Sequence, residues 1–229
     1  MLSAGQLAHY KDEGWLVVDD VISADEVQAL RRIVEGGGEG GASLFGINMT
    51  TSHPAFLALA RDPRITDRIA SLIGPNITLQ HSKTVQKHEG AGKQLPGGGA
   101  VRYHQDFAYF PHTNHDVLAA MLVLDNFTEA NGCMRVVPKS HKLGLLDHNT
   151  TPDGAFNAEP GVVSGQSKYH HSTQQIPRNS GQHDLAILDV LQGGVPGTAH
   201  DRATTTCGRT MRRCPGCNPG QEACPSTTP

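Results

Sequence analysis

Apolar positions with a helical period occur in the first third of the chain, where Val27, Leu30, Ile33 and Val34 form one stripe in residues 23–38. Apolar residues also recur in 54–72, and residues 3–13 are rich in helix formers. Ser3 is a favoured N-cap for the first stretch, and Ser23 can form a capping box with Glu26 at the start of the second. Pro63 is expected to break the third stretch in two, because proline cannot continue a helix. The sequence therefore predicts helices in these three stretches.

From residue 77 the pattern changes to that of short β-strands. Strand-like runs occupy residues 77–87, 100–110, 116–127, 133–141 and 184–191, and an earlier one occupies 15–22. Turn signals such as Asn131-Gly132 separate the central runs, which favours antiparallel pairing. Helices first and strands afterwards predict an α+β fold, mainly β, with a sandwich or barrel core. Residues 144–182 are polar and irregular, and we expect a long loop or lid there.

Composition narrows the class of partner. The chain of 229 residues is 37% hydrophobic, and its net charge is −3 with histidine counted as neutral. That charge gives no electrostatic case for nucleic acid or an anionic membrane surface. No apolar run approaches the roughly 20 residues of a membrane span. The N-terminus lacks the basic start and apolar core of a secretory signal, so none is expected. A cytoplasmic location is the expectation, and the oligomeric state stays open.

The stretch 193–229 differs from everything before it. It has almost no aliphatic residues and is rich in Thr, Arg, Gly, Pro and Cys, so poor order is expected. The sequence thus predicts one domain over 1–192, helical over 1–75 and β-rich over 76–192. Four cysteines lie in the tail: Cys207, Cys214, Cys217 and Cys224. A four-thiolate zinc site is chemically possible, and unpaired or randomly oxidised thiols are the alternative.

The motif YHQDFAYFP, residues 103–111, places candidate chemistry on a predicted strand. Residues two apart point to the same face of a strand, so His104 and Asp106 project together. A second histidine from a distant strand would complete the two-His-one-carboxylate set that holds non-haem Fe(II) and leaves three positions open for a co-substrate and oxygen. The alternative is a half-buried His–Asp hydrogen bond without a metal. Three aromatic neighbours either wall a dry pocket or pack in the core: Tyr103, Phe107 and Tyr109.

Three pieces of the chain occur in a recognisable order: TVQKHEGAG (84–92), YHQDFAYFP (103–111) and LAAMLVLDNFTEANGCMRVVPKSHKLG (118–144). Together with the opening helix and GWLVVDDVIS, they resemble the phytanoyl-CoA dioxygenase family of Fe(II)/2-oxoglutarate oxygenases over about residues 3–144. Lys139 stands where that family usually has glycine. The resemblance implies a double-stranded β-helix (jelly roll) with the N-terminal helices packed outside. It also implies hydroxylation of an aliphatic C–H bond of a small molecule.

The resemblance further implies roles for single residues. His104 and Asp106 match the proximal iron ligands. Lys87 matches a lysine that contacts 2-oxoglutarate in some members, and an exposed strand-end lysine is the alternative. His141 matches a family histidine that is structural or close to the substrate and is not a metal ligand. The implied cofactors are Fe(II) and O2, with 2-oxoglutarate as the co-substrate that is decarboxylated to succinate.

The match to the family fails in the distal part of the chain. There the family has a histidine, the third iron ligand, and about 11 residues later an arginine whose planar fork clamps 2-oxoglutarate. His200 is the nearest candidate for the ligand, and His183 is a rival. Arg212, with Arg209 as second choice, is the candidate for the clamp, although neither has the family spacing. A truncated chain and a shifted reading frame both explain the departure after about Val190.

Three functions remain open at the level of sequence. The first is an Fe(II)/2-oxoglutarate-dependent dioxygenase that acts on a small molecule and has no nucleic-acid or membrane partner. The second is a truncated or catalytically impaired jelly-roll relative that binds a metal or a small molecule without turnover. The third is a cupin-like metal enzyme that needs no 2-oxoglutarate. The sequence does not identify the substrate.

Overall fold

A computed structural model gives the fold of the protein. It describes residues 1–36, 48–87, 101–113, 116–125, 128, 133–150, 156–158, 174–176, 185–188, 192–194 and 203–213. Within these ranges, no helix is both long enough and apolar enough to cross a membrane.

The helices before residue 75 begin and end where their capping residues stand. They are α1 (Ala4–Glu13), α2 (Ala24–Val34), α3 (Met49–Ser52), α4 (Pro54–Arg61) and α5 (Pro63–Ile73). Ser23 forms the predicted capping box with Glu26, and Ser3, predicted as an N-cap, also forms a complete capping box, with Gln6. Asp62 ends α4 and caps α5, and Pro63 is the first residue of α5, which confirms the predicted break.

The strands form two antiparallel sheets and a separate ribbon. The large sheet has the order β1 (Trp15–Val18), β10 (Leu185–Leu188), β5 (Leu118–Val123), β12 (Ala203–Arg213), β2 (Ile77–Leu79), and β3 (Lys83–Lys87) also pairs with β12. The small sheet has the order β4 (Val101–His104), β11 (Gln192–Gly194), β6 (Met134–Val136), β9 (Gln174–Ile176). The ribbon pairs β7 (His148–Thr150) with β8 (Phe156–Ala158). Helices with antiparallel sheets confirm the predicted α+β class.

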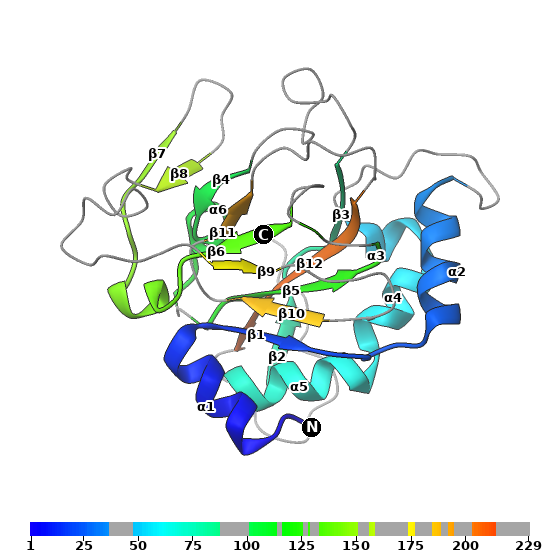
Figure 1. The fold of residues 1–229 in the computed structure, drawn as a ribbon, viewed down its shortest axis with the longest axis horizontal. Helices are drawn as coiled ribbons and strands as arrows, with labels where there is room; N and C mark the ends of the chain where they lie inside the picture. The colour runs from blue at the N-terminus through cyan, green and yellow to red at the C-terminus, as the bar shows by residue number, and fades with distance from the viewer. Residues whose placement is uncertain are drawn as a thin grey trace.

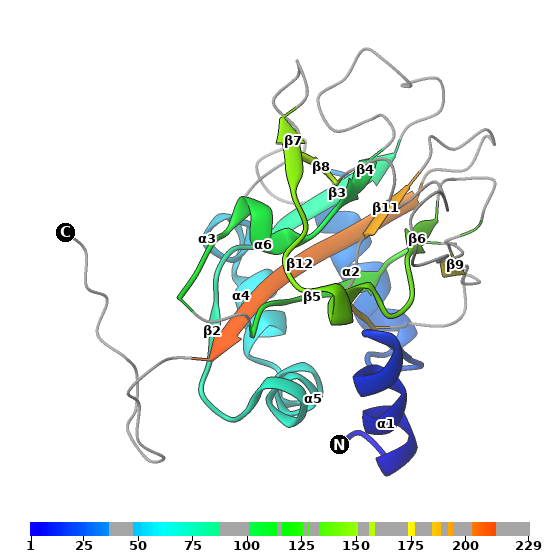
Figure 2. The same cartoon turned by 90° about the vertical axis from the view of Figure 1, so that its left-hand side faces the viewer.

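Strand β5 lies inside the large sheet and is buried on both faces. Its residues Ala120 and Leu122 pack in the aliphatic cluster that also contains Ile69 of α5. Met121 and Val123 pack instead beside Met134 of the small sheet. Helices α2, α4 and α5 therefore cover one face of the large sheet, here called the helix face, and the small sheet lies over the other, here called the inner face (Figures 1 and 2).

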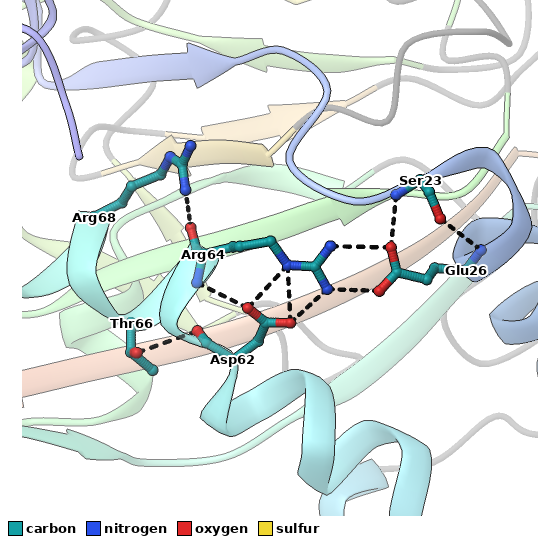
Figure 3. Close-up of polar contacts among 6 residues, drawn as sticks. All are labelled: Ser23, Glu26, Asp62, Arg64, Thr66 and Arg68. Carbon is teal, nitrogen blue, oxygen red and sulfur yellow. Dashed lines mark hydrogen bonds and ion pairs between the residues drawn. The ribbon is translucent and has the colours of Figure 1, made fainter.

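Polar contacts tie helix α2 to helix α5. Arg64 at the start of α5 donates hydrogen bonds to Glu26 of α2 and to Asp62, and Arg68 donates to the Arg64 carbonyl (Figure 3). Hydrogen bonds from the Arg64 guanidinium and the Ser23 N–H hold the pKa of Glu26 at about 2. This network is a structural junction between the first turns of α2 and α5.

The strands are shorter than the runs predicted from sequence, and three runs differ most. The run 77–87 is split into β2 and β3, the run 100–110 ends at His104, and the run 133–141 ends at Val136. Helix α6 (Asp106–Tyr109) and the 3₁₀ helix η1 (Ser140–Leu143) replace the ends of the last two. An acidic residue in the first turn stabilises a helix, and Asp106 holds that place in α6. The predicted loop 144–182 contains β7, β8 and β9.

Strand β12 lies inside the stretch 193–229, for which the sequence predicts poor order. It pairs with β5 on one side and with β2 and β3 on the other. Threonine favours strands, and pairing with the buried β5 supplies the apolar partner that the Thr-rich segment lacks in its own composition. The division of the chain at residue 192 stays a prediction. Within the stretch that follows, β12 is a regular strand where the sequence predicts poor order. Of the four tail cysteines, only Cys207 falls among the described residues, so the zinc site remains an expectation.

Candidate functional site

The two predicted iron ligands lie at the junction of β4 and α6. His104 is the last residue of β4, Asp106 is the first of α6, and Gln105 between them has an extended backbone. His104 Nε2 lies 3.4 Å from Asp106 Oδ1. The side chains therefore project together as predicted, although the strand ends between them. His104 is 8% exposed, so a ligand bound there would be largely shielded from water.

The pair faces the space between the two sheets. Across the small sheet, His104 pairs with Gln192, and Gln192 pairs with Val136. Directly paired residues share a face of a sheet. Val136 is fully buried and packs against Ala119 on the inner face of the large sheet. His104 thus lies on the face of the small sheet that looks toward the large sheet.

The donor types and their separation fit a divalent iron ion. An imidazole nitrogen and a carboxylate oxygen are two of the three ligands of the non-haem Fe(II) set. Two ligands at about 2.1 Å from one metal and at right angles lie ~3 Å apart, close to the observed separation. In the described part of the chain, no group of three His, Cys, Asp or Glu side chains converges on one point. His200 and His183, the candidates for the third ligand, lie outside the described residues.

Aromatic side chains border the pair on one side. The ring of Tyr109 meets that of His104 edge-on, with centroids 5.2 Å apart. Tyr103 points the other way and packs against the buried Val137. Of these two aromatic residues from the motif, Tyr109 lines the site and Tyr103 belongs to the packing behind it.

His81, which the sequence patterns did not single out, lies near the same pair. It follows β2, and its ring stacks on Phe110 with centroids 4.4 Å apart. Burial lowers the pKa of the His81 imidazole, the Lys83 ammonium lowers it further, and the Asp106 carboxylate acts in the opposite direction. His81 is thus close enough to Asp106 to feel its charge. The strand pattern gave no signal for this, because β2 ends at Leu79 and its Ile77 packs on the helix face.

The candidates for 2-oxoglutarate binding are placed by backbone register. Lys87 ends β3 and pairs with Ala203 of β12, three residues after His200. Arg209 pairs with Ala120, a residue of the helix face. Gly208 forms a bulge, after which Thr210 pairs with Ala119 of the inner face. Residues two apart on a strand lie on the same face, so position 212 belongs to the inner face, as Thr210 does. His104 lies on the side of the small sheet that faces it.

His141 lies away from the pair and holds the N-terminal helix. Its Nε2–H donates to the Lys11 carbonyl at 3.1 Å, and the backbone N–H of Lys139 donates to the Glu13 carbonyl at 2.8 Å. Lys142 Nζ lies 2.5 Å from Asp12 Oδ1. These donors satisfy carbonyls at the C-terminal end of α1 and place positive charge there, which stabilises a helix end. The contacts favour the structural reading of His141.

Comparisons with known proteins bear on the whole arrangement. Residues 40–183 match the model of the phytanoyl-CoA dioxygenase family. The "Probable alpha-ketoglutarate-dependent hypophosphite dioxygenase" of Stutzerimonas stutzeri is 30% identical over 174 residues, which cover 67% of this chain. The chain spans only 58% of the length of that relative.

Two solved structures share the fold. EctD from S. alaskensis, determined with 2-oxoglutarate and 5-hydroxyectoine, aligns with a TM-score of 0.72 at 17% identity and covers 93% of this chain and 76% of its own. The epimerase SnoN, determined with Fe3+, alpha-ketoglutarate and nogalamycin RO, aligns with a TM-score of 0.69 at 22% identity and covers 97% of this chain and 92% of its own.

Proposed function

The chain belongs to the phytanoyl-CoA dioxygenase family, and from this premise we propose that it is an Fe(II)/2-oxoglutarate-dependent dioxygenase that hydroxylates an aliphatic C–H bond of a small molecule. The observation that carries the proposal is the His104–Asp106 pair, 3.4 Å apart on the face between the two sheets. The two facing sheets support the finer proposal of a jelly-roll core.

The protein's part is to bind, orient and exclude water. His104 and Asp106 would hold the metal on one side, and His200, shortly before β12, is our proposal for the third ligand. When bound, iron with 2-oxoglutarate and O2 supplies the oxidising chemistry. In that chemistry one oxygen atom of O2 would enter the substrate as hydroxyl and the other would enter succinate, with release of CO2. The low exposure of His104 favours a reaction shielded from solvent.

Register supports Arg212 over Arg209 as the clamp on 2-oxoglutarate. The family spacing from histidine to arginine is about 11 residues, whereas Arg212 follows His200 by 12. The bulge at Gly208 absorbs one extra residue and returns position 212 to the inner face. Arg209, by contrast, pairs with a helix-face residue. We therefore propose that Arg212 binds the distal carboxylate, with Lys87 as a second contact.

An anaerobic titration with Fe(II) and 2-oxoglutarate tests the function. We expect the weak visible charge-transfer band of the chelate to appear in the wild type and to vanish in His104→Ala. Arg212→Ala should raise the Kd for 2-oxoglutarate about 10-fold or more, the cost of a lost charge-assisted pair, whereas Arg209→Ala serves as the matched control. A wild type that retains no iron would refute the proposal.

A second candidate is a relative that binds a metal or a small molecule without turnover. It is favoured by one observation: the family match ends at residue 183, before His200 and both candidate arginines. Succinate formation separates the two functions, because only the dioxygenase converts 2-oxoglutarate. The relatives' names cite compounds as different as hypophosphite and ectoine, so a small-molecule class is the finest substrate statement we propose.

A further inference from the structure

Gln105, the residue between the two predicted iron ligands, is held on the side opposite to them. Its side-chain Nε2–H donates to the Gly144 carbonyl and its Oε1 accepts from the Leu146 N–H, both at 2.9 Å. Both the nitrogen and the oxygen of the Gln105 side-chain amide are thus hydrogen-bonded to the backbone of one segment, residues 144–148. That segment begins the stretch for which the sequence predicts a loop or lid.

His148, in the same segment, binds the backbone of Gln105. Its Nε2 accepts the backbone N–H of Gln105 at 2.9 Å, and its Nδ1 lies 2.8 Å from the Leu146 carbonyl. A carbonyl only accepts, so Nδ1 carries the proton and Nε2 is free to accept, which fixes one neutral tautomer. The imidazole therefore bridges the segment to the peptide that joins His104 to Gln105.

The bonds act on the backbone that sets the direction of both ligands. His104 precedes this peptide and Asp106 follows Gln105, so a rotation there would change the separation of Nε2 and Oδ1. The turn lies beyond the regular pairing of the strand, because β4 ends at His104 and its register with β11 shifts between Gln192 and Gly194. Groups outside the ligand set that orient metal ligands typically change metal affinity 10–100-fold when removed.

We propose that His148 is a positioning residue for the iron site. With Gln105 it holds the turn between His104 and Asp106 in the geometry that binds metal, and it couples the segment 144–148 to that geometry. This proposal rests on the proposed Fe(II)-dependent function. It assigns to His148 no contact with the metal, the co-substrate or the substrate.

The test compares three histidine variants in the full-length chain. His148→Leu removes the acceptor, His148→Gln keeps an acceptor oxygen, and His141→Leu removes another partly exposed histidine, which bonds to α1 instead. Two quantities are measured in each: hydrogen exchange of the Gln105 amide by NMR, and the Kd for Fe(II) with 2-oxoglutarate from the charge-transfer band.

We expect His148→Leu to speed exchange of the Gln105 amide about 5-fold or more and to raise the Fe(II) Kd about 10-fold or more. His148→Gln should restore both to within about 3-fold, and His141→Leu should change neither, although it weakens the docking of α1. Unchanged exchange or unchanged iron affinity in His148→Leu would overturn the proposal. A wild type without the band would instead overturn the iron function itself, and the positioning role with it.

Discussion

The helix face of the large sheet and the end of β4 depend on different kinds of contact. On the helix face, β5 and helices α2, α4 and α5 bury a continuous aliphatic cluster. At the end of β4, the direction of His104 and Asp106 depends on a few polar bonds from Gln105 to residues about 40 positions later. Apolar packing tolerates change in graded steps, whereas a hydrogen bond requires one geometry. We therefore expect the first region to control stability and the second to control metal affinity.

The largest expected effect on stability lies on the helix face. Ile69 of α5 is fully buried in the aliphatic cluster. Ile69→Ala should lower the free energy of unfolding by about 2–5 kcal/mol, and Ile69→Val by about 1 kcal/mol, because each removed methyl group loses burial and leaves a cavity. Urea denaturation measures both. If Ile69→Val, while still folded, lowered the free energy of iron binding as much as the free energy of unfolding, the two regions would not control separate properties.

The converse change is made at Asp106. Asp106→Asn keeps the size of the side chain but removes the charge that a metal ligand supplies. We expect the Fe(II) Kd to rise about 100-fold, while the free energy of unfolding changes by less than about 1 kcal/mol. Asp147→Asn, an exposed carboxylate in the segment beside the site, is the matched control. Equal effects of the two variants on iron affinity would remove Asp106 from the ligand set.

The same contrast explains what the sequence could predict. Helix starts at Ser3 and Ser23 and the break at Pro63 follow from residues within one turn, so local patterns located them. The closeness of His104 and Asp106 could be predicted because Gln105 between them has an extended backbone, so the two side chains still project together although the strand has ended. The roles of Gln105 and His148 could not be predicted from local patterns, because the bonds of Gln105 join residues 39 to 43 apart. Strand β12 was missed for the same reason, since its pairing with β5 is long-range.

An intermediate effect is expected where local caps carry charge. Glu26 both caps α2 and pairs with Arg64, and its pKa is lowered to about 2. A carboxylate with a lowered folded-state pKa stabilises the fold above its unfolded pKa and loses that contribution as the pH falls toward the folded value. Glu26→Gln keeps the cap but loses the charge. At pH 7 we expect it to cost about 0.5–1 kcal/mol, since both partners are over 40% exposed.

The pH dependence of that cost is the test. The difference in unfolding free energy between wild type and Glu26→Gln should be full at pH 7 and shrink between about pH 4.5 and pH 2. It should also shrink in about 1 M salt, because exposed ion pairs are screened. A difference that stays constant from pH 7 to pH 2.5 would mean that the cap alone, and not the charge pair, stabilises this junction.

An effect of similar size is expected at Lys139, where backbone strain and side-chain charge both act. Lys139 has φ of 65°, a left-handed conformation that favours glycine, the residue usual in the family at this position. Its Nζ also lies 3.2 Å from Asp12 and 3.3 Å from Glu13, and both side chains of the Lys139–Asp12 pair are about half exposed.

Two substitutions separate these contributions. Lys139→Ala loses the ion pairs and keeps the strain, whereas Lys139→Gly loses the ion pairs and relieves the strain. Lys139→Gly should therefore be more stable than Lys139→Ala by about 1 kcal/mol in urea denaturation. Relative to wild type, Lys139→Gly should change the free energy of unfolding little, because exposed ion pairs contribute little. If Lys139→Gly were the less stable of the two, unfolded-chain entropy would outweigh strain. In either case the iron Kd should not move, because these contacts hold α1 and not the His104–Asp106 turn.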